Sequence, residues 1–470
     1  MNPNPAAARA AEAFDSGRFA ADLARRVAFR TESQNPQRAD ELRRYLSDEI
    51  APTLGTLGFE SQLHHNPVAG APPLLIAERF EDAALPTVLV YGHGDVVRGH
   101  EGQWAEGRDP WALTPDTQAT PERWYGRGGA DNKGQHSINL AALAAVIGAR
   151  GGRLGFNAKF LVEMGEETGS PGLDAFCREQ RTRLAADALI ASDGPRLTAA
   201  RPTVFLGTRG VGNFDLTLKL RSGGHHSGNW GGLLRNPGTV LAAAITSLVD
   251  GQGRIRVPGL RPPAIPAAVR AALADIEVGG SPGDPAIDPL WGEPGLTPAE
   301  RVFGWNTLEV LALGCGNPAA PVNAIPPEAR ATLQLRFVVG TDAPRMREHV
   351  LAHLAAQGFG DIEVSEPVLM AATRLDPDSA WVRLALDAIE RATGAKPALL
   401  PNLGGSLPND VFADILGLPT VWVPHSYPAC SQHAPNEHLL APLVREGLQM
   451  MATIFWEVGE QAQSLPRRSR

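Results

Sequence analysis

The spacing of apolar residues changes twice along this chain, and the two changes define its domain organisation. Before about residue 211, short apolar runs alternate with helical patterns. The runs cover residues 87–91, 159–164 and 188–191. Strands that alternate with helices are typical of a largely parallel sheet with helices on both faces. The first part of the chain is therefore predicted to be an α/β domain.

From about Gly212, apolar and polar residues alternate one by one. The alternation is clear at 214–220 and 333–337, and it is typical of an antiparallel sheet with one exposed face. A Pro- and Gly-rich segment covers residues 257–298, and a helix is predicted at 342–358. This region is predicted to be a second, smaller α+β domain.

The α/β pattern returns near the C-terminus. A helix is predicted at 379–393, a strand at 419–423 and a last helix after Ala441, so the second domain is an insertion into the first. The predicted fold class is α/β, with a mixed, largely parallel sheet flanked by helices and an inserted α+β domain. The predicted boundaries are 1–211 and 373–470 for the two parts of the first domain and 212–372 for the insertion.

Composition and charge exclude several classes of protein. The 470 residues include 43 basic and 51 acidic side chains, which gives a net charge of −8 and no basic block for binding nucleic acid. No apolar run approaches the length of a membrane span, and the N-terminal residues lack the apolar segment of a secretory signal. The three cysteines, Cys177, Cys315 and Cys430, form no C-x-x-C pair. We therefore expect no nucleic-acid partner, no membrane partner, no disulfide framework and a cytoplasmic location.

Acidic residues and histidines follow the predicted parallel strands. The string YGHGDVV contains His93 and Asp95, EMGEETGS contains Glu166 and Glu167, and ASDGP contains Asp193. The carboxyl ends of parallel strands form the binding edge of an open α/β sheet. We expect these side chains to meet at that edge.

Two further residues extend this set. Asp131, in YGRGGADNKG, precedes a predicted helix, and His433, in SQHAPNEHL, follows the late strand. Imidazole and carboxylate groups together suit a divalent metal such as zinc, and more carboxylates than one ion needs favour two ions that share a carboxylate. Zn²⁺ is the expected metal, with Mn²⁺ or Co²⁺ as alternatives. The predicted ligands are His93, Asp131, Glu167, Asp193 and His433.

Glu166 and Glu167 are predicted to have different tasks. Adjacent side chains at a strand end point in opposite directions, so one carboxylate can bind metal while the other faces the substrate. A carboxylate in the second position can take a proton from a metal-activated water and hand it to a leaving amine, which is amide hydrolysis. Asp95 follows His93 by two residues and is expected either to hydrogen-bond the free ring nitrogen of His93 or to cap the loop.

Taken in order, the strings YGHGDVV, YGRGGADNKG, EMGEETGS, ASDG and QHAPNE resemble the metal-site motifs of the M20 family of co-catalytic metallopeptidases. This family includes carnosinase-type dipeptidases, glutamate carboxypeptidases, acetylornithine deacetylase and succinyl-diaminopimelate desuccinylase. The resemblance runs from about residue 20 to 457 and implies two metal ions bridged by Asp131. Glu166 matches the general base, and Asp95 matches the acid behind His93. The other ligands divide into His93 and Asp193 for one metal, and Glu167 and His433 for the other.

The resemblance also assigns roles within the insertion, which it implies is a lid and commonly a dimerisation domain. A homodimer through this domain is therefore expected. RSGGHHSGNWGG resembles the segment whose histidine stabilises the oxyanion, often from the partner subunit. His226, directly before Ser-Gly, matches that histidine better than His225. Whether His226 acts in its own subunit or in the partner is left open.

Three further residues are predicted to bind substrate. Arg336 lies on the polar side of the 333–337 alternation, and a guanidinium forms paired hydrogen bonds with a carboxylate. It resembles the carboxylate-binding arginine of the dipeptidase branch. Asn323 in VNAIP and Ser406 in GGSLP match substrate-contacting positions of that branch, although a turn cap is an equal alternative for both.

These residues predict a metal-dependent hydrolase that cleaves an amide bond next to a carboxylate. The strings YGRGGADNKG, GTRG and HHSGNWGG favour a dipeptidase or carboxypeptidase acting on small peptides. The alternative is an N-acyl-amino-acid amidohydrolase of the deacetylase or desuccinylase type. A non-catalytic homologue is disfavoured because no ligand or base is missing. Leu403 stands where the dipeptidase branch carries a charged residue before Gly-Gly, so the side-chain specificity is left open.

Overall fold

The computed structural model describes residues 4–280 and 284–468. Contacts between Cα atoms divide the chain into two compact units. Unit 1 comprises the chain up to Gly207, Leu375–Leu400, and the chain from Pro408 onward. Unit 2 comprises Thr208–Arg374 and the loop Pro401–Leu407. Unit 2 therefore combines the inserted region with a short loop that lies far from it in sequence.

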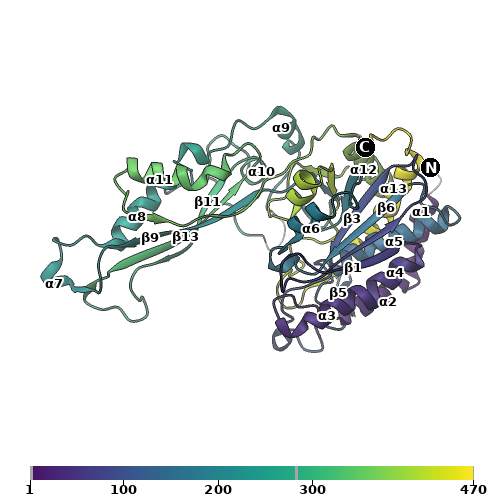
Figure 1. The fold of residues 1–470 in the computed structure, drawn as a ribbon, viewed down its shortest axis with the longest axis horizontal. Helices are drawn as coiled ribbons and strands as arrows, with labels where there is room; N and C mark the ends of the chain where they lie inside the picture. Colours follow the sequence, from purple (N-terminus) through teal and green to yellow (C-terminus); the bar gives the residue numbers. More distant parts are fainter. Residues whose placement is uncertain (1–3, 281–283, 469–470) are drawn as a thin grey trace. The chain divides into compact units, whose positions relative to one another are not determined.

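Unit 1 is built on a mixed eight-stranded sheet (Figure 1). In spatial order its strands are β1 (Glu60–His64), β2 (Leu74–Arg79), β6 (Asn157–Glu163), β3 (Thr87–His93), β7 (Ala188–Ala191), β17 (Thr420–Trp422), β8 (Thr203–Phe205) and β16 (Ala398–Leu400). β3 is parallel to β6 and β7, β17 is parallel to β7, and β16 is parallel to β8. The pairs β1–β2, β2–β6 and β8–β17 are antiparallel. The predicted α/β fold with a largely parallel sheet is confirmed.

Helices pack around this sheet, and the sequence of each reflects its surroundings. The longer helices are α1 (Pro5–Asp15), α2 (Arg18–Ala28), α5 (Lys133–Ala149), α12 (Ala380–Thr393) and α13 (Ala441–Glu460). α5 packs against α1 and α13 and is buried along most of its length, which is why it carries apolar residues on nearly every side.

Shorter elements complete unit 1. The helical ones are η1 (Pro36–Arg38), α3 (Ala39–Arg44), η2 (Tyr45–Ile50), α4 (Ala51–Thr56), η3 (Glu101–Gln103), η4 (Glu166–Thr168), α6 (Leu173–Glu179) and η7 (Val411–Ile415). A separate small sheet joins β18 (His438–Leu440), β5 (Arg123–Tyr125) and β4 (Thr114–Asp116).

Unit 2 contains the antiparallel sheet that the alternating pattern predicted. Its strands are β9 (Gly210–Lys219), β11 (Thr307–Gly314), β13 (Glu328–Phe337), β14 (Glu363–Val364) and β15 (Val368–Met370). β9 pairs with β13 on one side and with β14 and β15 on the other, and β11 forms the edge beyond β13. Apolar side chains at alternate positions pack with residues of α8 (Pro237–Leu248) and α11 (Met346–Ala356) to form the core of this unit.

The remaining elements of unit 2 are short. They are β10 (His225–His226), α7 (Ser227–Trp230), η5 (Pro258–Leu260), α9 (Ala267–Leu273), α10 (Pro298–Phe303), β12 (Ala324–Ile325) and η6 (Ala343–Arg345). None of the helices among the described residues combines the length and the apolar character that a membrane span requires.

Candidate metal centre

Parallel pairing brings the strand-end residues of unit 1 to one edge of the sheet. β3 ends at His93, β6 ends at Glu163 and β7 ends at Ala191, and these strands are mutually parallel neighbours. Asp131 lies two residues before α5, and His433 lies in the loop between β17 and β18. The five residues predicted as metal ligands meet there in two overlapping groups.

The first group consists of His93, Asp131 and Asp193, whose ligand atoms lie within 4.8 Å of one another. The Nε2 atom of His93 is 3.0 Å from Oδ1 of Asp131 and 3.6 Å from Oδ2 of Asp193. All three side chains are buried, and Oδ2 of Asp193 has no hydrogen-bond partner. A buried carboxylate oxygen without a partner is unfavourable, so this atom is suited to ligate a cation.

The second group consists of Asp131, Glu167 and His433, again with ligand atoms within 4.8 Å of one another. The Nε2 atom of His433 is 2.9 Å from Oδ2 of Asp131 and 3.0 Å from Oε2 of Glu167. Asp131 therefore directs one carboxylate oxygen toward His93 and the other toward His433. This is the arrangement that a carboxylate shared by two metal ions requires.

The charges of this centre also fit cations. Burial and the negative charge of Asp131 raise the pKa of Glu167 to about 7 and the pKa of Asp193 to about 6. Burial and neighbouring carboxylates likewise raise the pKa of Glu166. Carboxylates repel each other when they are crowded into a buried site. Divalent cations would relieve this repulsion, so the residues present fit two such ions.

The side chains of Glu166 and Glu167 point in different directions, but the physical reason differs from the predicted one. The prediction placed them at a strand end, where the pleat would separate them, but they lie in the one-turn segment η4, three residues beyond the end of β6. Successive side chains of such a turn point about 120° apart. Glu167 faces His433, whereas Oε2 of Glu166 lies 3.9 Å from Nε2 of His93.

Asp95 combines the two roles that the sequence left open. Its carboxylate accepts the backbone N–H groups of Glu166 at 3.2 Å and Glu167 at 3.1 Å, so it caps the turn that carries both glutamates. The Nδ1 atom of His93 lies 3.4 Å from the same carboxylate and 3.1 Å from the backbone carbonyl of Asp95. Asp95 therefore orients residues of both ligand groups.

Sequence reasoning missed Glu437, which supports the backbone beneath Asp131. Its Oε1 atom accepts the N–H groups of Ala130 at 2.9 Å and Asp131 at 3.1 Å. Its Oε2 atom accepts a hydrogen bond of 2.7 Å from Arg127, and both side chains are 1% exposed. The residue stands in the string QHAPNE, but its target lies 306 residues earlier. Gln432, also missed, donates a hydrogen bond to the Asp131 carboxylate.

The predicted residues of unit 2 form two separate pairs. His226 in β10 is opposite Ala324 in β12, and the N–H of Ser227 donates to the carbonyl of Asn323 at 2.9 Å. Arg336 donates from Nη1 to Oγ of Ser406 at 2.9 Å. The structure therefore places His226 beside Asn323 and Arg336 beside Ser406.

The β9–β13 ladder separates these two pairs. Arg336 is opposite Val211 at one end, and Glu328 is opposite Lys219 at the other. The eight residue steps from Glu328 to Arg336 correspond to about 27 Å of strand. β10 and α7 follow the Lys219 end of the ladder, and Figure 1 shows α7 at the tip of unit 2.

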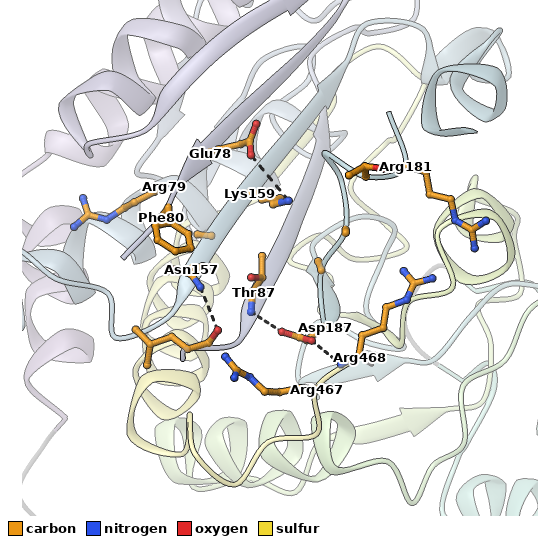
Figure 2. Close-up of a pocket in the computed structure, with 15 residues that line it drawn as sticks. Glu78, Arg79, Phe80, Thr87, Asn157, Lys159, Arg181, Asp187, Arg467 and Arg468 are labelled. Atoms are coloured by element: carbon orange, nitrogen blue, oxygen red, sulfur yellow. Dashed lines mark hydrogen bonds and ion pairs between the residues drawn. The ribbon is translucent and has the colours of Figure 1, made fainter. Parts of the chain in front are cut away.

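A cavity of about 690 Å³ in unit 1 lies away from the metal centre. Figure 2 shows Thr87, Asn157 and Asp187 around it, with Arg468 hydrogen-bonded to Asp187 through its backbone N–H and Arg467 next to it. Thr87 and Asn157 begin β3 and β6, so the cavity is at the amino edge of the sheet. The metal-centre residues are at the carboxyl edge, about 20 Å away along a seven-residue strand.

Comparison with known proteins agrees with this geometry. The model of Peptidase family M20/M25/M40 matches residues 89–457. A human Beta-Ala-His dipeptidase is 26% identical over 406 residues, which cover 83% of this chain and 78% of the relative. A Cysteinylglycine-S-conjugate dipeptidase of Corynebacterium striatum is 27% identical over 337 residues, which cover 69% of this chain and 70% of the relative.

Solved structures share the fold. Human carnosine dipeptidase 1 superposes with a TM-score of 0.76 at 24% identity, over 97% of this chain and 100% of that chain. The M20 family metallo-carboxypeptidase Sso-CP2 of Sulfolobus solfataricus gives a TM-score of 0.75 at 24% identity, over 94% of this chain and 99% of that chain. The family match spans most of the chain, and the family predicted from the five motifs is confirmed: this chain belongs to Peptidase family M20/M25/M40 and is a hydrolytic metallopeptidase.

Proposed function

We propose that this enzyme is a dipeptidase that cleaves the amide bond next to the free carboxylate of small peptides. The observation that carries the proposal is the pair of ligand groups that share Asp131, because two cations held in this way are suited to amide hydrolysis. The names of the human and Corynebacterium striatum relatives, which are both dipeptidases, support the choice of small peptides as substrates.

Two divalent ions complete the proposed site, and Zn²⁺ is the expected metal because the ligands combine imidazole with carboxylate. His93 and Asp193 would hold one ion, Glu167 and His433 the other, and Asp131 both. Bound divalent ions supply Lewis acidity, which polarises a carbonyl oxygen and lowers the pKa of water. Mn²⁺ and Co²⁺ suit the same donor atoms and are alternatives.

Glu166 is the proposed general base. It belongs to neither ligand group, yet its carboxylate lies 3.9 Å from Nε2 of His93 and its side chain retains 17% exposure. Burial raises the pKa of Glu166, so its carboxylate is a stronger proton acceptor than that of an exposed glutamate. Glu166 takes the proton of the attacking water and transfers it to the leaving amine. Asp95 holds Glu166 in place through the backbone hydrogen bond to its N–H.

Arg336 and Ser406 are proposed to bind the substrate carboxylate. Arg336 donates to Oε1 of Gln334 at 3.0 Å and to Ser406 at 2.9 Å. These bonds fix the plane of the guanidinium, which forms no ion pair with any aspartate or glutamate of the described residues. A fixed guanidinium is suited to bind a carboxylate through two parallel hydrogen bonds.

The proposed role of His226, stabilisation of the oxyanion, requires a second copy of the chain. A dipeptide spans about 7 Å, much less than the roughly 27 Å of strand between the Arg336 and His226 ends of the ladder. One substrate therefore cannot reach both residues of the same chain. We propose a homodimer in which His226, together with Asn323, completes the active site of the partner.

Exposed apolar residues of unit 2 support this dimer. Leu233 and Val322, near the His226 tip, are 77% and 78% exposed, and Leu311 and Leu313 on the edge strand β11 are each 55% exposed. Clustered apolar side chains and an uncovered strand edge are typical of protein–protein contacts. The three cysteines form no disulfide, which is compatible with the proposed cytoplasmic location.

An activity panel tests the proposed function. The zinc-loaded enzyme is given unblocked dipeptides and, in parallel, N-acetyl and N-succinyl amino acids, and the release of free amine is measured. Cleavage of the dipeptides at the higher kcat/KM is expected. Preference for the acylated amino acids would show that the enzyme is instead an N-acyl-amino-acid amidohydrolase.

A further inference from the structure

Arg209 lies beside Arg336 in unit 2, and the two form a pair of positive charges. Arg336 is opposite Val211 in the β9–β13 ladder, and Arg209 directly precedes Gly210, the first residue of β9. Ser406 connects them, because its Oγ accepts from Arg336 and donates to the backbone carbonyl of Arg209 at 2.8 Å.

The loop Pro401–Leu407 covers Arg209. The N–H of Arg209 donates to the carbonyl of Leu403 at 3.1 Å, and its Nε donates to the carbonyl of Gly404 at 3.1 Å. The residue is only 8% exposed, and its Nη1 has no hydrogen-bond partner. A buried guanidinium with a free donor is unfavourable unless an anion binds it.

Within the part of the chain that the structure describes, no acidic side chain forms an ion pair with either arginine, and Glu309 attracts Arg209 without contacting it as an ion pair. The hydrogen bonds of both guanidiniums go to neutral groups. Burial and the charge of Arg336 lower the pKa of Arg209 to about 10, against the attraction of Glu309. The chain as a whole has 51 acidic and 43 basic residues, so acidic residues are available elsewhere.

Arg330, on the same strand as Arg336, is an arginine whose charge is balanced by an acidic residue. It lies on the same face of β13 as Arg336, six residues away, and it forms an ion pair with Asp215. Its side chain is 67% exposed. The buried Arg209 lacks the direct ion pair that the exposed Arg330 has, which is the reverse of what stability alone would favour.

We propose that Arg209 is a second substrate-binding residue, and that it selects peptides whose C-terminal residue is aspartate or glutamate. In this arrangement Arg336 binds the α-carboxylate, as in the proposed function on which this inference rests, and Arg209 binds the side-chain carboxylate. Two carboxylates on one residue balance two guanidinium charges, whereas a neutral C-terminal residue leaves one charge uncompensated.

The test compares Ala-Glu with Ala-Gln, which differ only in the charge of the side chain. The wild-type zinc enzyme is expected to have a kcat/KM for Ala-Glu at least about tenfold higher than for Ala-Gln. In Arg209→Met this ratio is expected to fall close to one, and in Arg209→Lys to an intermediate value. Arg330→Met is the matched control, with the wild-type ratio. Measurable but equal rates on both dipeptides in the wild type overturn the proposal, even if Arg209→Met does not fold.

A binding measurement separates this proposal from the proposed function. Zinc-loaded Glu166→Gln, in which turnover is expected to be at least about 100-fold slower, is titrated with each dipeptide by calorimetry. Tighter binding of Ala-Glu by at least about tenfold supports the proposal even if the wild type cleaves neither peptide, in which case the assigned reaction is wrong. Equal binding overturns the role of Arg209 and leaves the assigned reaction unaffected.

Discussion

The metal centre of unit 1 and the Arg209–Arg336 pair of unit 2 carry uncompensated charge of opposite sign. The metal centre gathers four carboxylates, Asp131, Glu166, Glu167 and Asp193, around two imidazoles, and one buried oxygen has no partner. The arginine pair places two guanidiniums together, and neither forms an ion pair with an acidic residue of the described chain. We propose that the unbalanced charge indicates the ligand in each region: a pair of cations in unit 1 and the carboxylates of the substrate in unit 2.

In a third region of the molecule, the buried charges of Arg127 and Glu437 balance each other. Arg127 and Glu437 are buried as deeply as His93 and Asp193, but they form an ion pair of 2.7 Å. The carboxylate also accepts two backbone N–H groups, so it is satisfied without a ligand. Burial of charge is therefore a weak indicator of a site, and so is an unpaired N–H, because Nε and Nη2 of Arg127 also lack hydrogen-bond partners. The missing ion-pair partner is the informative feature.

Among the predictions, removal of the metals is expected to have the largest effect on peptide hydrolysis, and it tests the metal centre of unit 1. Dialysis against a chelator should abolish peptide hydrolysis, because the carboxylates of unit 1 then lack the cations that activate water. Activity should return when two equivalents of Zn²⁺ are added, as measured by amine release and metal analysis. Full activity in demonstrably metal-free protein would contradict the assignment of the centre.

Glu166→Gln should lower kcat by about 10²- to 10⁴-fold, because the amide cannot accept the proton of the attacking water. The metal content should remain that of the wild type, since Glu166 belongs to neither ligand group. Glu60→Gln, on the exposed edge strand β1, is the control and should leave kcat unchanged. A loss of metal in Glu166→Gln would show that this carboxylate is a ligand instead.

Arg336→Ala tests the proposed binding of the substrate carboxylate in unit 2. The KM for dipeptides should rise by about 100-fold, because a charge-assisted contact to the carboxylate is lost, while kcat changes less. The same variant should show little change on a dipeptide amide, which has no carboxylate to bind. Equal losses on both substrates would argue that Arg336 supports the fold of unit 2 and does not bind substrate.

Glu437→Gln should have the smallest effect of the four changes. It is expected to lower metal affinity. The amide retains one oxygen for the N–H groups of Ala130 and Asp131 but no longer neutralises Arg127, so the position of Asp131 is expected to relax. We expect metal affinity to fall by about tenfold, the lower part of the range for supporting residues of metal sites. Competition with a chromogenic chelator measures this, and kcat at saturating zinc should recover. An unchanged affinity would show that Glu437 only stabilises the loop.

Local sequence patterns were sufficient to predict the main features of the fold. The two changes of apolar spacing predicted the α/β unit and the inserted antiparallel sheet, because alternation and helical spacing are properties of neighbouring residues. They did not predict that the loop Pro401–Leu407 packs with unit 2. That loop contacts Arg209 across 195 positions of sequence, and no local pattern records such a contact.

The sequence by itself determined which side-chain groups, imidazoles and carboxylates, are available to ligate metal in this protein. Histidines and acids that follow parallel strands must gather at one sheet edge, so His93, Glu167 and Asp193 were recognisable without coordinates. Only the tertiary structure decided which charges lack a partner: Oδ2 of Asp193 and Nη1 of Arg209 are unsatisfied, whereas Glu437 is fully paired. The physical reason is that burial and hydrogen-bond satisfaction depend on groups hundreds of residues apart, which only the folded chain brings together.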